Sequence, residues 1–74
     1  MTQDRRAQHR AHVQRLFGPD TLLFDDLALE DWFCFAGDEH GAVYQKKRKA
    51  RYQHQGWLCY IQRTQPVKRR PAPQ

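Results

Sequence analysis

The sequence predicts an α+β fold: an N-terminal helix packed on a small antiparallel sheet of three or four strands, followed by a disordered basic tail. Three observations support this. A stretch of helical periodicity ends at Gly18-Pro19. Aromatic-rich runs then alternate with glycine-containing turns, as is typical of antiparallel strands. Finally, 74 residues have room for one domain with a small core.

The helix is expected over residues 4–17, where Val13, Leu16 and Phe17 share one face at i, i+3 and i+4 spacing. Gly18 suits a left-handed C-cap, and the proline after it cannot continue a helix. The apolar stripe fades toward the arginine-rich start of the chain, so we expect the first turn to fray.

Residues 20–29 are ambiguous. Asp20 could cap a short helix, whereas Thr21–Phe24 could equally form a buried strand. Hydrophobic periodicity does not separate the two in so short a run. We expect a short strand or an extended segment and leave the helix as the alternative.

The strands are expected from Trp32 onward. Residues 32–36 are aromatic-rich, a loop over residues 37–41 has glycine at both ends, and strand character resumes at Ala42. A turn over residues 53–56 leads into a strand over residues 57–62. These strands would form a meander with the helix laid across one face.

The domain is expected to span residues 8–63. Residues 1–7 would form a frayed basic N-terminus. Residues 64–74 contain three prolines and the basic tract Lys68-Arg69-Arg70, so they are expected to form a disordered tail.

Charge is segregated along the chain. Residues 1–17 carry a net charge of +3, residues 18–41 hold seven acids and no base, and residues 42–74 hold nine bases and no acid. The overall charge of +5 therefore understates how basic the C-terminal half is. We expect the acidic segment to counterbalance the basic half within the fold; binding of a basic partner or a divalent cation is the alternative.

The central basic run at residues 46–51 indicates nucleic-acid binding, because lysine and arginine neutralise phosphates while flanking tyrosines stack on bases. If the run is extended, alternation places Tyr44, Lys46, Arg48, Ala50 and Tyr52 on one face. Protection of an exposed edge strand is the simpler alternative. The residues expected to bind nucleic acid are Tyr44, Lys46, Lys47, Arg48, Lys49, Arg51, Tyr52, Lys68, Arg69 and Arg70.

The leading function is therefore an accessory or regulatory protein that binds DNA or RNA. The alternative is a modulator of the kind used by phages and mobile elements, which binds and inhibits a host protein such as RNA polymerase or a nuclease. A third reading is a small ribonuclease that uses His40 and His54 as acid and base, although no carboxylate is placed in the sequence to orient them. We expect no enzymatic activity and no small-molecule substrate.

No cofactor or metal is expected. Cys34, His40, His54 and Cys59 could in principle hold zinc, but their spacing matches no close-knuckle pattern. Both cysteines lie within aromatic runs and are expected to be reduced and packed, as in a cytoplasmic protein. The polar start of the chain has no signal-peptide character, and we expect no membrane association. Most of the aromatic residues are expected in the core, Trp57 and Phe35 among them; an exposed remainder would mark a binding site.

Overall fold

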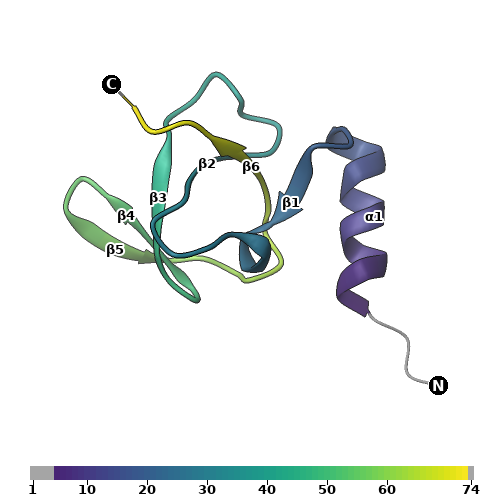
Figure 1. Ribbon diagram of the computed structural model, residues 1–74, viewed down its shortest axis with the longest axis horizontal. Coiled ribbons are helices and arrows are strands. Elements are labelled where there is room, and N and C mark those ends of the chain that lie inside the picture. The colour runs from purple at the N-terminus through teal and green to yellow at the C-terminus, as the bar shows by residue number, and fades with distance from the viewer. Residues whose placement is uncertain (1–4, 74) are drawn as a thin grey trace.

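The computed structural model describes residues 5–73 and has an α+β fold, as expected (Figure 1). One α-helix precedes a six-stranded antiparallel sheet, so the expected number of strands was too low. The strands lie in the order β1-β6-β2-β3-β4-β5, which makes β1 and β5 the two edges. The elements are α1 (Arg5–Phe17), β1 (Thr21–Leu23), β2 (Trp32–Phe35), β3 (Tyr44–Arg48), β4 (Arg51–His54), β5 (Trp57–Tyr60) and β6 (Pro66–Arg70).

The first additional strand arises because the basic run is a hairpin. The chain reverses at Lys49-Ala50, so that Lys46 lies opposite Tyr52 and a register shift separates this pair from the next. The sequence reading of one extended segment from Tyr44 to Tyr52 was therefore wrong. No glycine, proline or asparagine marks this reversal in the sequence.

The second additional strand lies in the expected tail. Strand β6 pairs with β1 on one side and β2 on the other, and Val67 is fully buried between them. The expectation of disorder is therefore wrong for residues 66–70. Pro66 begins the strand, a position at which proline's missing N–H is tolerated.

Helix α1 lies beside β1 (Figure 1) and is joined to the rest of the fold by polar contacts of His9, Arg10 and Gln14. Its one buried residue is Val13, whereas Leu16 and Phe17 are exposed, so the predicted apolar face is only partly used. The Gln14 side-chain amide donates to the Thr21 carbonyl at 3.0 Å. The helix already includes Arg5; the part of the expected frayed segment before it lies outside the described residues. No helix in residues 5–73 combines the length and the apolar character needed to cross a bilayer.

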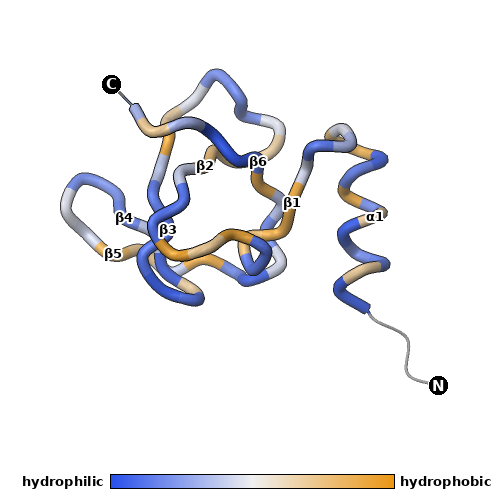
Figure 2. Tube along the Cα trace, in the orientation of Figure 1, coloured by the Kyte–Doolittle hydropathy of each residue, from blue (hydrophilic) through white to orange (hydrophobic). Residues whose placement is uncertain are grey.

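The ambiguous segment becomes strand β1 followed by a 3-10 turn, η1 (Phe24–Asp26). This confirms the expected short strand. Figure 2 shows apolar residues along β1, and the chain then carries Phe24 and Leu27 into the core. The Phe24 and Phe33 rings meet edge to face with centroids 5.3 Å apart. The core cluster comprises Phe24, Leu27, Phe33, Ile61 and Val67.

The candidate nucleic-acid interface

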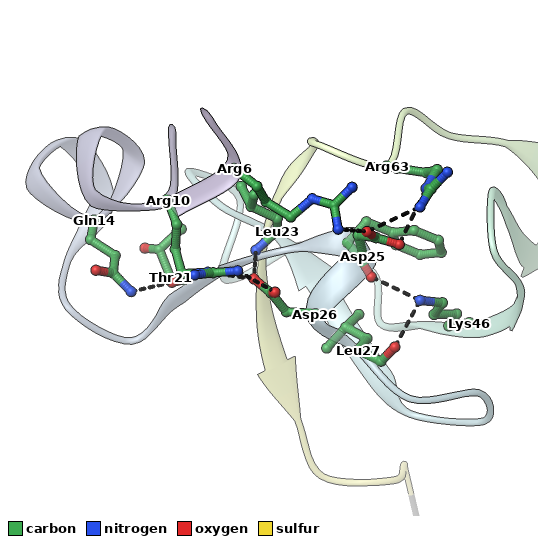
Figure 3. A network of polar contacts seen from close by, with 11 residues as sticks. Arg6, Arg10, Gln14, Thr21, Leu23, Asp25, Asp26, Leu27, Lys46 and Arg63 are labelled. Atoms are coloured by element: carbon green, nitrogen blue, oxygen red, sulfur yellow. Dashed lines mark hydrogen bonds and ion pairs between the residues drawn. The ribbon is translucent and has the colours of Figure 1, made fainter. Parts of the chain in front are cut away.

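Lys46, the first cation of the basic run, is buried and is only 4% exposed. Its ammonium donates to the Phe24 carbonyl at 3.0 Å and to the Leu27 carbonyl at 2.7 Å, and it lies 4.8 Å from the Phe24 ring centroid (Figure 3). Burial lowers the pKa of Lys46 from its ordinary value. Lys46 therefore ties the η1 turn to β3, a position that does not favour contact with a phosphate.

We expect Lys46→Met to destabilise the fold by about 1–3 kcal/mol, because it leaves the Leu27 carbonyl without its charged donor. Urea unfolding followed by circular dichroism measures the change. Lys49→Met is the matched control, since Lys49 is exposed in the hairpin turn and should alter stability by less than about 0.5 kcal/mol. Equal stabilities for the two variants would show that Lys46 does not stabilise the fold.

The rest of the basic run lies nearer the surface. Lys47 pairs with Glu30 at 2.8 Å. Arg48 and Lys49 are exposed at the end of the hairpin. Arg51 donates to the Ala50 carbonyl at 2.9 Å, and the central carbon of its guanidinium lies 5.1 Å from the Tyr60 ring centroid. Within residues 5–73, no carboxylate pairs with Arg48, Lys49 or Arg51.

The two tyrosines that flank the run face the core. Tyr44 and Tyr52 are half-buried, and their rings meet at 4.9 Å between centroids. Tyr52 also packs edge to face on Phe33, and burial raises the pKa of its phenol. Neither ring offers the open stacking surface that the sequence suggested.

The basic residues of β6 differ from one another. Lys68 pairs with Glu39 at 3.0 Å and with Asp20 at 3.3 Å, and its hydrogen bond to Glu39 raises its pKa. Arg69 pairs with Asp31 at 3.4 Å. Arg70 is exposed and has no carboxylate partner among the described residues.

The acidic segment is largely counterbalanced within the fold. The Asp25 carboxylate forms ion pairs with Arg6 at 2.6 Å and with Arg63 at 3.2 Å, and the Asp26 carboxylate forms one with Arg10 at 2.6 Å (Figure 3). Six of the seven acids in residues 18–41 take part in ion pairs: Asp20, Asp25, Asp26, Glu30, Asp31 and Glu39. Among residues 5–73, the cations of the β3–β4 hairpin and of β6 that have no carboxylate partner are Arg48, Lys49, Arg51 and Arg70, which we call the open cations.

Exposed aromatic side chains lie on β5, where the Tyr60 ring is beside the open cation Arg51. Trp57 is 76% exposed and Tyr60 66% exposed, and Leu58 between them is also open. The expectation that Trp57 belongs to the core was therefore wrong, whereas Phe35 packs against the core cluster. The sequence held a signal for this, because β5 carries large apolar residues at consecutive positions and an edge strand cannot bury both faces.

The cysteines and histidines considered as zinc ligands or as ribonuclease residues have separate surroundings. Cys34 and Cys59 are free thiols, and burial raises the pKa of Cys34. His54 lies against Tyr44, whereas His40 is exposed in the loop before β3. In the described part of the chain, no three His, Cys, Asp or Glu side chains form a metal-binding group, and no hydrogen bond joins either of these histidine rings to a carboxylate.

No protein-family model matches the chain, and no curated protein or solved structure is significantly similar to it. Its function is therefore inferred from its own side chains. The distinctive feature is a set of open cations, of which Arg51 lies beside the exposed Tyr60 ring, on a described chain whose acidic residues are mostly paired.

Proposed function

We propose that the protein binds nucleic acid through the β3–β4 hairpin and the end of β6, using the open cations Arg48, Lys49, Arg51 and Arg70. One observation carries the proposal: these four side chains have no carboxylate partner in residues 5–73, although six of the seven acids in residues 18–41 are paired with other bases. Cations left open in this way gain most from phosphates, because binding releases the counterions condensed on the polyanion.

The proposed role is that of an accessory or regulatory protein in the cytoplasm, without catalytic activity of its own. Two free thiols in a chain of this size are in keeping with a reducing compartment. Phosphate contacts position a protein without reading sequence, so binding through the open cations alone should be tolerant of sequence.

Binding should weaken steeply with salt, with a log–log slope of about 0.7 to 0.9 per phosphate neutralised. Changing Arg48 and Lys49 together to Ala should reduce this slope by one to two units for every sequence tested. Fluorescence anisotropy with labelled oligonucleotides over a salt series measures it. The matched control removes two exposed arginines, Arg5 and Arg15, from α1, which lies beside the opposite edge of the sheet (Figure 1).

If the control lowers the slope as much as the hairpin variant does, binding is governed by net charge and the hairpin site is wrong. Absence of binding at low salt would overturn the proposal altogether, because even a modest cationic surface holds nucleic acid there.

A second candidate function is favoured by the free edge of β5. An edge strand with exposed Trp57, Leu58 and Tyr60 is suited to receive an extended segment of a protein partner. This corresponds to the alternative of a phage-type modulator that inhibits a host protein. A few anchor residues would then carry most of the affinity, and salt would act mainly on the association rate.

A further inference from the structure

The strand register aligns five side chains in a row across the outer face of the sheet. Trp32 lies opposite Arg70 on one side and Gln45 on the other, Gln45 opposite Gln53, and Gln53 opposite Leu58. Successive residues of a strand point to opposite faces. Because the neighbours Phe33, Tyr44 and Tyr52 pack with the core, this row faces away from it.

The row borders an open hollow of about 440 Å³ between β2 and the β4–β5 turn. Trp32 forms part of its wall, and the Gln45 amide is held by a 3.0 Å hydrogen bond from Nε2 to the Glu30 carbonyl. Each glutamine side chain has an NH2 group that donates hydrogen bonds and a carbonyl oxygen that accepts them. The edge of a nucleobase presents both acceptors and donors, so a glutamine amide can pair with it. The hollow is lined by Trp32, Val43, Gln45, Gln53, Gln55 and Gly56.

A second aromatic ring lies on the same outer face. Tyr60 is two residues beyond Leu58 and pairs across the strands with Arg51, whose guanidinium lies 5.1 Å from its ring centroid. Trp32 and Leu58 are three strand spacings apart, about 14 Å. An indole and a phenol ring thus flank a polar strip, with Arg70 beyond one end and Arg51 beside the other.

Charge on this face favours an anionic occupant. Glu30, which borders it, is paired with Lys47. The residues of the described strands β2 to β6 include no acid. A stretch of polyanion could therefore cross the face without meeting an open carboxylate of those strands.

We propose that the outer face binds single-stranded nucleic acid, with one base in the Trp32 hollow and another on Tyr60. This inference rests on the proposed function and adds the substrate class. A single strand presents the faces and edges of its bases to aromatic and amide side chains, whereas a duplex hides the faces in its stack. The open cations hold the phosphates on either side.

Tryptophan fluorescence tests the face directly, because the described chain carries one tryptophan on each side of the sheet. Trp57→Phe leaves Trp32 as the reporter on the outer face, and Trp32→Phe leaves Trp57 beside His54 on the opposite one. Titration with a mixed-sequence single strand of about 12 nucleotides, within the site sizes of such platforms, should quench Trp32 and leave Trp57 nearly unchanged. The matching duplex should quench neither.

Affinity supplies a second readout that does not depend on Trp32. Tyr60→Ala should weaken single-strand binding about 5- to 100-fold, the value of one stacked base, and should hardly change duplex binding. Leu16→Ala, an exposed apolar residue of α1, is the control and should have no effect. Gln53→Ala should alter the ranking of the four homopolymers while leaving the salt slope unchanged.

Equal binding of single and double strands, with no quenching of Trp32 and no effect of Tyr60→Ala, would overturn the inference while the proposed function stood. Quenching of Trp57 alone would place the strand on the other face and would also overturn it. No binding of either form at low salt would overturn both proposals, and would favour a protein partner at β5.

Discussion

Phe33→Ala should destabilise the protein by about 3–5 kcal/mol and unfold much of it at room temperature. Phe33 is fully buried, and its ring contacts Phe24, Phe35, Tyr44 and Tyr52 at centroid distances of 5.3 to 6.0 Å. Truncation would open a cavity in a core too small to close it by rearrangement. Urea unfolding followed by circular dichroism measures the loss.

Trp57→Ala is the control for this prediction, because it removes an even larger ring from the surface. With the side chain 76% exposed, we expect a change within about 0.5 kcal/mol. A loss as large as that of Phe33→Ala would show that β5 is covered and that Trp57 belongs to the core after all.

Local signals predicted much of the fold. Gly18 has a φ of 116°, as a left-handed helix C-cap requires, and α1 ends at the residue before it. The turn expected over residues 53–56 is a tight reversal in which Gln55 and Gly56 both have positive φ. In each case a glycine, Gly18 or Gly56, stands at the position where the backbone adopts a positive φ.

Strand β6 could not be predicted in this way, because its stability comes from distant partners. Its sequence, Pro-Val-Lys-Arg-Arg, has one apolar residue and the composition of a solvated tail. The strand forms because Val67 fills the space between β1 and β2, and because the Lys68 ammonium pairs with the two carboxylates of Asp20 and Glu39. Because β6 pairs with segments more than 30 residues away in the sequence, its own residues do not indicate the pairing.

In the candidate site, too, the sequence predicted the features that depend on local residues and missed those that depend on distant partners. The open cations Arg48, Lys49, Arg51 and Arg70 were all among the predicted binding residues. The burial of Lys46 was not foreseeable, since its carbonyl partners lie 22 and 19 residues away in the chain. Trp32, Gln45 and Gln53 were missed because only the register of three strands, β2, β3 and β4, brings them into one row.

Asp26→Asn should cost about 1.5–3 kcal/mol, because the carboxylate of Asp26 joins α1 to the sheet by charge-assisted hydrogen bonds. It accepts from the Arg10 side chain at 2.6 and 2.8 Å and from the Leu23 backbone N–H at 3.0 Å (Figure 3). Asp20→Asn is the matched control: its carboxylate is mostly exposed and pairs with Lys68 at 3.3 Å, so we expect a loss below about 1 kcal/mol.

The same carboxylates should make stability depend on pH on the acid side. The hydrogen bond from Arg63 lowers the pKa of Asp25, and that from Arg10 lowers the pKa of Asp26, both from an ordinary value of 3.8. The unfolded chain therefore binds more protons in this range, so the stabilisation is fully present above about pH 5 and is lost as pH falls through 3.8 and below. Urea midpoints measured from pH 6 to pH 2.5 should fall steeply for the wild type and less steeply for Asp26→Asn, which has one fewer of these groups to protonate. Parallel curves for the two proteins would mean that the contact between Asp26 and Arg10 contributes nothing to folding.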